Sequence, residues 1–310
     1  MGAGQLGSRY LQGLSKVSVP LDIWVSDVSA DSLARSKVRW QEVDGTKTEH
    51  QVQYVTGLTE FPSEIDLVIV ATSADVRATV VVQLVEKITV RYWVLEKVLA
   101  QSHEEISNIQ AAIGQNSLAW VNTPMYMWPL YKNIRAQYAG IQPINACFEG
   151  LSALACNAIH YIDFVGRWNK SNPIAIDTSG LLKEWRPAKR INFYEIYGEL
   201  LVNFDDGSRL KIGSSAADSE YRANVKVQQD EWHIFESEGV AKMQDDRTIH
   251  GACEFQSQLT APLIESILQN GFCDLPPLPV SAAQHRIFLG ELLEHWNRYM
   301  PNRLDRLPIT

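Results

Sequence analysis

The sequence predicts an α/β protein with a parallel sheet in its first part and a largely antiparallel sheet in its second. Up to about residue 120, short apolar runs alternate with helical patterns, which is typical of βαβ units. From about residue 145 the pattern changes to longer segments in which apolar and polar residues alternate, as in half-buried antiparallel strands. A chain of 310 residues is long enough for two domains. We therefore expect domains at residues 1–122 and 123–310.

The elements of the first part follow from its apolar runs and helical periods. We expect strands at 21–26, 51–55, 67–71, 92–95 and 118–121, and helices at 5–14, 29–37, 75–87 and 103–113. In the second part we expect a helix over 154–168, strands within 191–204, 209–213, 224–229 and 231–236, and closing helices at 261–269 and 282–299. Asp205-Asp206-Gly207 predicts a hairpin turn, because glycine tolerates positive φ.

Composition excludes several classes of protein. With 28 Lys and Arg against 36 Asp and Glu, the net charge of −8 argues against a nucleic-acid or anionic-membrane surface. No apolar run approaches the roughly 20 residues of a membrane span, and no secretory signal is recognisable, so we expect a cytoplasmic protein. The four cysteines are scattered, which predicts neither a metal site nor a disulfide framework.

The most specific local signal is Gly2-Ala3-Gly4-Gln5-Leu6-Gly7, a GxGxxG segment at the start of a predicted helix. In a Rossmann unit the first glycine makes a tight turn, the second lets the backbone approach a pyrophosphate, and the third permits close packing of helix on strand. The free amides of the helix N-terminus then face the phosphates. The segment predicts a dinucleotide-binding loop; a glycine-rich N-terminus without a ligand is the alternative.

Asp27 ends the next predicted strand, twenty residues after Gly7. A carboxylate there accepts hydrogen bonds from an adenosine ribose and repels a 2′-phosphate, so NAD is favoured over NADP. The alternatives are a carboxylate that only caps the following helix and a solvated strand end.

The glycine loop should follow an apolar strand, yet only Met1 stands before Gly2. Such a strand normally lies in the middle of the sheet, where its loss leaves backbone groups unpaired. We expect a sequence truncated at its start; a fold that tolerates the gap is the alternative.

Further motifs, taken with the glycine loop and Asp27, resemble the Gfo/Idh/MocA oxidoreductases, the group of glucose-fructose oxidoreductase and inositol dehydrogenase. They are Val70-Ala71-Thr72-Ser73, Leu95-Glu96-Lys97-Val98 and the segment from Cys156 to Asp163. The resemblance implies a nicotinamide cofactor held by Gly2, Gly4, Gln5, Leu6, Gly7, Asp27, Ala71, Thr72, Ser73, Glu96 and Lys97. It implies a substrate held by Lys97, Tyr126, Cys156, Asn157, His160 and Asp163.

Lys97 occupies the lysine of the family's Glu-Lys-Pro pattern, with Val98 in place of the proline. The resemblance implies that Lys97 donates to the substrate hydroxyl or takes part in a proton relay. A surface lysine paired with Glu96 or Glu104 is the alternative.

Cys156, His160 and Asp163 fall on one face of a helix. The resemblance implies that His160 is the general base, but the family has an aspartate where Cys156 stands. Asn157 is then expected to supply a neutral hydrogen bond, and Asp163 to orient the imidazole. A core histidine bonded to Asp163 is the alternative for His160.

Two segments carry weaker hypotheses. Tyr126 follows the last strand of the first domain, where family members place residues that touch nicotinamide and substrate. A cationic cluster around Trp185 indicates ordinary surface charge beside a sheet; a carboxylate or phosphate site with the indole stacked on a ring is the alternative. The cluster comprises Lys183, Arg186, Lys189 and Arg190.

Together these features predict hydride transfer between a nicotinamide and a secondary alcohol of a sugar, inositol or sugar-nucleotide-like substrate. Lys97 and His160 would be the catalytic residues. A redox-inactive binding protein of the same fold, acting as a regulator or scaffold, is the alternative. We expect a homodimer or homotetramer formed through the sheet of the second domain.

Overall fold

A computed structural model describes residues 1–310 except 44–48, 116, 139, 141–142 and 216–219. The chain divides into two compact units. The first comprises residues 1–96, 107–122 and 254–277, and the second comprises 97–106, 123–253 and 278–310. One crossing lies between Asn122 and Thr123, where the domain boundary was expected, but neither unit is one continuous stretch. No helix of the described residues is long and apolar enough to cross a bilayer.

The first unit confirms the predicted parallel α/β architecture, but its strands form two separate sheets. β1 (Asp22–Ser26) pairs with β2 (Gln51–Val55), and β3 (Glu64–Val70), β4 (Thr89–Glu96) and β5 (Leu118–Asn122) pair in that order. All of these pairs are parallel. The helices are α1 (Gln5–Leu14), α2 (Ala30–Gln41), α3 (Ala74–Val85), α7 (Gln256–Asn270) and the part of α4 (His103–Ile113) from residue 107 onward, with the short 3-10 helix η1 (Leu58–Glu60).

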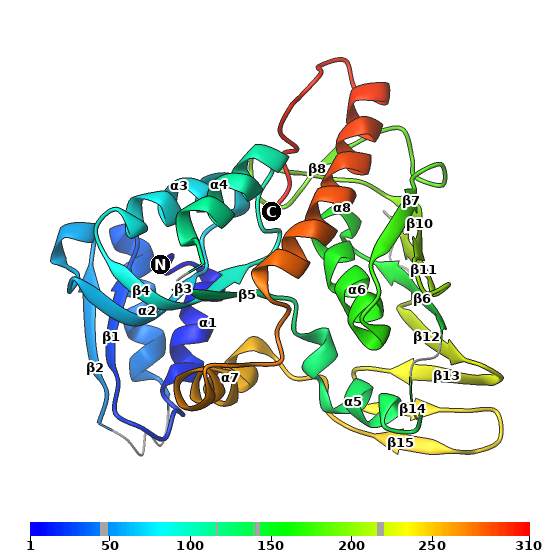
Figure 1. Ribbon diagram of the computed structural model, residues 1–310, viewed down its shortest axis with the longest axis horizontal. Coiled ribbons are helices and arrows are strands. Elements are labelled where there is room, and N and C mark those ends of the chain that lie inside the picture. Colours follow the sequence, from blue (N-terminus) through cyan, green and yellow to red (C-terminus); the bar gives the residue numbers. More distant parts are fainter. Residues whose placement is uncertain (44–48, 116, 139, 141–142, 216–219) are drawn as a thin grey trace. The chain divides into compact units, whose positions relative to one another are not determined.

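Burial explains why β4 lies in the middle of its sheet. Residues 92–96 are all buried, and Trp93, Val94 and Leu95 are fully so. A parallel strand covered on both faces requires such a continuous apolar run. α1 and α7 lie side by side (Figure 1), and a side chain on Gly13 would collide with Thr260, so this glycine sets their separation.

The second unit is built on an eight-stranded sheet in the order β15-β14-β13-β12-β6-β11-β10-β7, antiparallel except for the pair β6 and β11. Its strands are β6 (Ile144–Leu151), β7 (Pro173–Asp177), β10 (Gly198–Phe204), β11 (Arg209–Ser214), β12 (Arg222–Val227), β13 (Asp230–Phe235), β14 (Val240–Lys242) and β15 (Thr248–His250). β8 (Arg186–Pro187) and β9 (Tyr194–Glu195) form a separate ribbon. The helices are η2 (Pro124–Met127), α5 (Pro129–Arg135), α6 (Leu154–Asn169) and α8 (Leu278–Tyr299).

α6 packs on the sheet and on α8 (Figure 1). Leu154, Ala158 and Ile162 are fully buried at four-residue spacing, which gives α6 an apolar stripe toward the sheet. The expected strand over 191–204 is interrupted at residues 196–197, between β9 and β10, and β10 begins at Gly198 with φ +117°. The predicted turn at Asp205-Asp206-Gly207 is confirmed, with Gly207 at φ +87° between β10 and β11.

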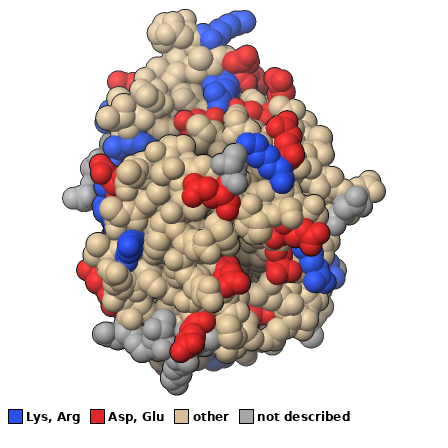
Figure 2. Space-filling view, turned by 90° about the vertical axis from the view of Figure 1, so that its left-hand side faces the viewer, with Lys and Arg blue, Asp and Glu red and all other residues tan. Residues whose placement is uncertain are grey.

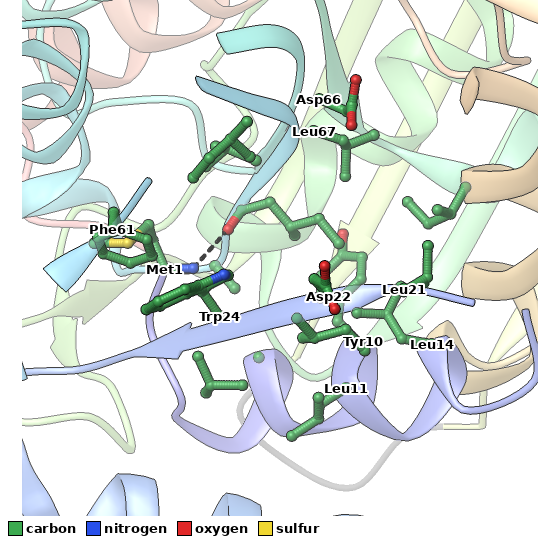
Figure 3. A pocket seen from close by; sticks show the side chains of 18 of the residues that line it. Met1, Tyr10, Leu11, Leu14, Leu21, Asp22, Trp24, Phe61, Asp66 and Leu67 are labelled. Atoms are coloured by element: carbon green, nitrogen blue, oxygen red, sulfur yellow. Dashed lines mark hydrogen bonds between the residues drawn. The ribbon is translucent and has the colours of Figure 1, made fainter. Parts of the chain in front are cut away.

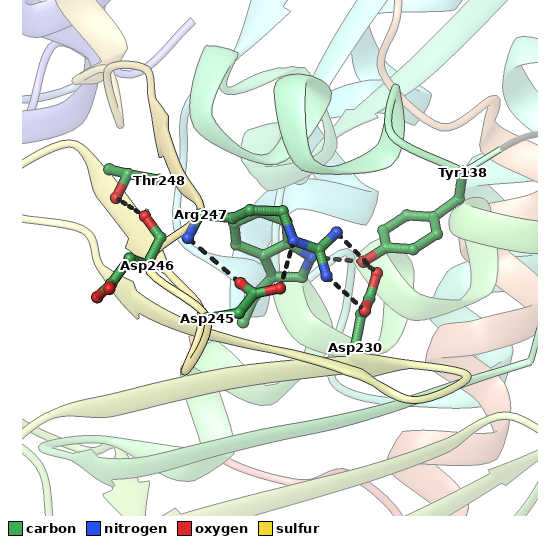
Figure 4. Close-up of polar contacts among 7 residues, drawn as sticks. Tyr138, Asp230, Asp245, Asp246, Arg247 and Thr248 are labelled. Carbon is green, nitrogen blue, oxygen red and sulfur yellow. Dashed lines mark hydrogen bonds and ion pairs between the residues drawn. The ribbon is translucent and has the colours of Figure 1, made fainter.

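An ion-pair cluster joins the hairpin of β14 and β15 to β13 (Figure 4). The Arg247 guanidinium lies 2.8 Å from Asp230 and 2.8 Å from Asp245. Asp230 also accepts a hydrogen bond from Tyr138, whose hydroxyl accepts one from the Trp232 indole at 2.6 Å. These exposed charges position the hairpin, although exposed ion pairs contribute little to stability.

Gly150 in β6 offers a test of the sheet. It has φ +79°, and a Cβ there would collide with the backbone of Glu220, whereas Gly207 has φ +87° and open space around it. Gly150→Ala should therefore lower the free energy of unfolding by about 2 kcal/mol more than Gly207→Ala, because only Gly150 adds an overlap to the cost of positive φ. Chemical denaturation of both variants measures this difference; equal losses would contradict the close approach of Glu220.

Candidate functional site

The three glycines of the loop in the first unit meet three different requirements. Gly2 has φ +86°, and a Cβ there would lie 2.9 Å from the amide nitrogen of Thr72. A Cβ on Gly7 would overlap the carbonyl oxygen of Gly2, so the third glycine permits α1 to approach the turn. Gly4 has no atom within 4 Å of its Cβ position. The backbone at Gly4 therefore faces open space, which leaves room for a ligand to approach it.

α1 begins at Gln5 with Gly4 as its N-cap, and no side chain caps it. The amides of a first helical turn have no intrahelical acceptor, and the helix dipole favours an anion beside them. Gln5 and Leu6 lie in this first turn. The loop and helix together fit a phosphate group.

Asp27 directly follows β1 and lies against the glycine loop. Its Oδ2 accepts a hydrogen bond from the amide of Ala3 at 2.7 Å, and its Oδ1 accepts one from the amide of Ser29 at 2.8 Å. Ser29 is the N-cap of α2, so the carboxylate contacts both the loop and the start of the helix. A carboxylate has about four acceptor sites, and these two bonds leave capacity for ribose hydroxyls.

Ala71, Thr72 and Ser73 connect β3 to α3 beside Gly2. Ala71 donates its amide to the carbonyl oxygen of Met1 at 2.8 Å, and the buried Arg77 donates to the carbonyl oxygen of Thr72. The hydroxyl of Thr72 is buried and has no hydrogen-bond partner among the residues that the structure describes. A buried hydroxyl without a partner beside a glycine turn fits a polar ligand, because an unsatisfied polar group is costly.

Glu96 is buried in a network of protein donors. It accepts hydrogen bonds from the Tyr10 hydroxyl at 2.5 Å and from the Asn122 amide at 2.6 Å. Asn122 also donates to Gln256 in α7. Burial, and then Glu96, raise the pKa of Tyr10 well above its ordinary value, so the phenol stays a donor. Glu96 therefore ties β4 to α1 and β5.

Lys97 directly follows β4 in the chain and contacts the beginning of α6. Its Nζ donates to the carbonyl oxygen of Cys156 at 2.9 Å and to Oδ1 of Asn157 at 3.2 Å. Lys97 is half-buried. Asn157 thus contacts Lys97 through a neutral side-chain oxygen.

His160 lies one helical turn beyond Cys156. Burial holds its pKa well below the ordinary range, and the positive charge of Lys97 and the nearby His285 lower it further. An imidazole with a depressed pKa is neutral at neutral pH. It can therefore accept a proton beside a cationic lysine.

Glu195 is the residue that sequence reasoning missed. This β9 carboxylate is only 7% exposed and accepts hydrogen bonds from the amides of Ala155 at 2.7 Å and Cys156 at 3.3 Å. Burial raises its pKa, while Cys156, these amides and Lys97 lower it. Glu195 and Cys156 are 39 positions apart, so no local pattern relates them.

The Cys156 thiol is uncharged at neutral pH. Burial, opposed by Lys97 and supported by Glu195, raises its pKa to about 12. The carboxylate of this cluster therefore comes from Glu195 and not from position 156.

Asp163 is fully buried on α6, where its Oδ2 accepts a hydrogen bond from the Thr123 hydroxyl at 2.8 Å. Its other oxygen has no partner, and no bond to His160 is present among the described contacts. The expected pairing of Asp163 with His160 is thus replaced by a bond to Thr123. Burial raises the pKa of Asp163 to about 7, although Arg167 and Thr123 lower it.

Tyr126 in η2 lies between two cations. The guanidinium carbons of Arg135 and Arg167 stand 3.3 Å and 4.0 Å from its ring centroid. Two cation–π contacts hold the ring in place and leave its hydroxyl as the polar end.

The alternative in which the Trp185 indole stacks on a ligand ring is wrong. Its side chain is 3% exposed, donates to Nδ1 of His295 at 3.2 Å and packs on Trp296. An indole inside the second unit has no face for a ligand ring. Three of the cluster's cations instead lie over other aromatic rings: Lys183 over Tyr299, Arg186 over Tyr197 and Arg190 over Phe193.

The part of the chain that the structure describes holds no group of three or more metal-ligating side chains. All four cysteines are free thiols.

Comparison with known proteins shows the fold. No family model matches the chain, and no curated protein matches it. UDP-N-acetylglucosamine 3-dehydrogenase GnnA from Acidithiobacillus ferrooxidans is 13% identical, with a TM-score of 0.68 over 94% of this chain and 93% of that chain. Levoglucosan dehydrogenase, solved with NADH and L-sorbose, is 13% identical, with a TM-score of 0.69 over 96% and 95%.

A third similar structure is biliverdin reductase from Synechocystis sp. PCC 6803, in complex with biliverdin and NADP+. It is 13% identical, with a TM-score of 0.68 over 92% of this chain and 94% of that chain. The structural neighbours are dehydrogenases of the Gfo/Idh/MocA type, so the predicted resemblance is confirmed at the level of the fold.

The buried Asp163 predicts a pH dependence. Its pKa is about 7 in the folded chain, whereas an aspartate in an unfolded chain has a pKa of about 3.9, so the folded state keeps a proton that the unfolded state loses between these values. The Asp163 carboxyl is therefore stabilising below pH 4, and this contribution is lost as pH rises toward 7. The Asp163→Asn variant keeps an acceptor for Thr123 and has no carboxyl to titrate. Relative to this variant, the free energy of unfolding of the parent should fall by up to about 4 kcal/mol over that range. Urea denaturation of both chains between pH 4 and 8 measures the difference; parallel profiles would contradict the raised pKa.

Proposed function

We propose that this protein is a nicotinamide-dependent oxidoreductase that interconverts a secondary alcohol and a ketone on a sugar, inositol or sugar-nucleotide-like substrate. The observation that carries the proposal is the placement of Lys97 against the first turn of α6, with the neutral His160 on the same helix. A fixed cation beside an uncharged base suits the oxidation of a carbinol, in which the base takes the hydroxyl proton while the hydrogen on the carbinol carbon leaves as hydride.

In this proposal Lys97 donates a hydrogen bond to the substrate oxygen and stabilises the negative charge that develops there. His160 takes the hydroxyl proton during oxidation and returns it during reduction. The nicotinamide, when bound, accepts or supplies the hydride. Cys156 and Asn157 fix the ammonium of Lys97, and Glu195 holds the backbone of the same helical turn. Tyr126 and Asp163 complete the proposed substrate side.

The proposed cofactor side lies in the first unit. Gly4 offers open space, the first turn of α1 offers amides, and the Thr72 hydroxyl lacks a partner. The Asp27 carboxylate favours NAD over NADP, because it repels a 2′-phosphate. Ala71, Ser73, Glu96 and Lys97 remain proposed contacts of the nicotinamide. Levoglucosan dehydrogenase, which shares the fold, carries NADH in its structure.

A redox-inactive binding protein is the second candidate, and Cys156 is the observation that favours it. The thiol is neutral and cannot replace the carboxylate that the family has at this position. Such a protein would bind a nucleotide or sugar without oxidising or reducing it, so the absorbance of NADH would not change.

We also propose a cytoplasmic homodimer or homotetramer formed through the open face of the eight-stranded sheet. The partners would be small molecules and not nucleic acid or membrane. The net charge of −8, and the interspersed acidic and basic side chains on the face in Figure 2, support the proposal that neither nucleic acid nor a membrane is a partner.

On the eight-stranded sheet, Lys211 is paired with both Glu149 and Glu199, so the sheet face that carries these side chains has polar groups.

The proposal predicts the effect of removing either proton-handling group. On a substrate found by screening sugars, inositols and sugar nucleotides with NAD or NADH, Lys97→Met and His160→Asn should each lower kcat by about a hundredfold or more. The double variant should lose little beyond that, because each group serves the same proton. Binding of NADH should change little.

Lys87→Met is the matched control, because Lys87 is exposed at the end of α3 and should leave kcat unchanged. Full turnover by His160→Asn would place the base elsewhere. Binding of NADH without turnover on any member of the panel would favour the regulator.

A further inference from the structure

A cavity of about 380 Å³ in the first unit is lined by residues of β1, β3 and α1 (Figure 3). Its walls are mainly apolar, and they include Gly2 and Gly7 of the glycine loop. The cavity therefore belongs to the surroundings of the proposed cofactor site.

A cluster of titratable side chains in the second unit lies outside the residues so far proposed for the site. It consists of Glu236, which directly follows β13, with Tyr131 of α5, Tyr161 of α6 and Tyr221, which directly precedes β12. The carboxyl of Glu236 accepts hydrogen bonds from the Tyr131 hydroxyl at 2.5 Å and from the Tyr221 hydroxyl at 2.8 Å. Both bonds end on Oε1, so the described contacts leave Oε2 to a further donor.

Tyr161 adds a third phenol to the cluster. Burial, and then Glu236, raise the pKa of Tyr161, while burial, Tyr161 and Glu236 raise the pKa of Tyr221. Electrostatic effects of this kind require proximity, so the Tyr161 hydroxyl lies near both groups. The Tyr161 ring packs on Phe148 with their centroids 4.4 Å apart, which holds it in place.

No cation is paired with Glu236 in the part of the chain that the structure describes. At the other end of β13, by contrast, Asp230 is paired with Arg247. Glu236 is half-buried, and burial raises its pKa, while hydrogen bonds from Tyr131 and Tyr221 lower it. A carboxylate removed from water without a cation is costly, because hydrogen bonds only partly replace its hydration. Glu236 therefore lacks a counter-charge that a ligand can supply.

We propose that Glu236 and the rings of Tyr161 and Tyr221 bind a primary ammonium group, so that the substrate is an amino sugar or an amino cyclitol. The ammonium donates a hydrogen bond to Oε2 of Glu236, and its charge lies against the tyrosine rings, which attract cations. The inference rests on the proposed function, because it assigns this ammonium to the molecule whose hydroxyl proton His160 takes.

The position of Tyr161 in α6 links the cluster to the proposed base. His160 and Tyr161 are consecutive, so their Cα atoms lie about 3.8 Å apart and their side chains leave the helix about 100° apart. A six-membered ring whose carbinol lies at His160 can therefore present another substituent to Tyr161. The charge of Lys97 repels an ammonium at the carbinol end, and the carboxylate of Glu236 attracts it at the other. The two charges together orient the substrate.

Calorimetric titration of the nucleotide-free chain with glucosamine and with glucose tests the inference, because the two sugars differ only in an ammonium or a hydroxyl at one carbon. Glucosamine should bind more tightly by about tenfold or more, as expected of a hydrogen bond between charged groups. Glu236→Gln keeps an acceptor for the two tyrosines and removes the charge, so it should abolish this preference. Glu238→Gln is the matched control, because Glu238 is exposed and the same charge is lost two positions away. It should preserve the preference.

Tyr161→Leu is a second variant, which decides the matter if Glu236→Gln does not fold. It removes one ring and keeps both hydrogen bonds to Glu236. The affinity for glucosamine should fall by about threefold, and the affinity for glucose should fall less, because only the ammonium gains from the face of the ring. Thermal unfolding of each variant checks that the fold is intact.

Equal affinities of the parent for the two sugars, or no binding of either, would overturn the inference. A preference for glucosamine that survives Glu236→Gln, or an equal loss of both affinities in Tyr161→Leu, would also overturn it. The titrations contain no nucleotide, so their failure leaves the oxidoreductase proposal to the turnover measurement. Binding of glucosamine through Glu236 without oxidation of any amino sugar would instead overturn the proposed function and leave the ammonium site standing.

Discussion

The backbone pairing of Met1 and Gly2 is the constraint on which the first unit depends. These residues bond to β3 on one side and to β1 on the other, at the point where the glycine loop begins. Gly2 makes this possible because it adopts φ +86° against the backbone of residues 71–72, where a Cβ has no room. The direction of α1, and therefore of its first amides, follows from this turn.

In the second unit, burial sets the charge states of the proposed proton-handling groups. His160 is neutral because its surroundings disfavour the imidazolium, while the ammonium of Lys97 is held by oxygens of Cys156 and Asn157. Glu195 places a carboxyl group of β9 beside the first turn of α6, next to the neutral thiol of Cys156.

Much of the fold could be predicted because it depends on local patterns. The expected helices at 5–14 and 103–113 agree with α1 and α4, and the hairpin at Gly207 depends on one glycine. β6, the strand that joins the two halves of the large sheet, was not predicted, because its burial comes from distant partners. The position of residues 254–277 in the first unit also depends on long-range packing of α7 on α1.

The candidate site was predictable where a motif is contiguous. The glycine loop and Asp27 were identified from their spacing, and in the structure the amide of Ala3 donates to Asp27. Glu195 was missed because only the tertiary fold brings it to α6. The hydrogen bond from Thr123 to Asp163 joins residues 40 positions apart. The sequence predicted His160 as the partner of Asp163 and gave no sign of Thr123. Polar groups that meet across such distances leave no periodic signal in the sequence.

The most direct test of the account is the binding of NADH to the parent chain and to Gly4→Val, followed by thermal unfolding. Because Gly4 has φ −63° and open space at its Cβ, the substitution should leave the unfolding temperature of the chain alone unchanged. The account predicts that NADH raises the unfolding temperature of the parent with the logarithm of its concentration, and that Gly4→Val loses this response because the side chain occupies the approach to the loop. A parent chain that shows no stabilisation by NADH, NAD or their phosphorylated forms would contradict it.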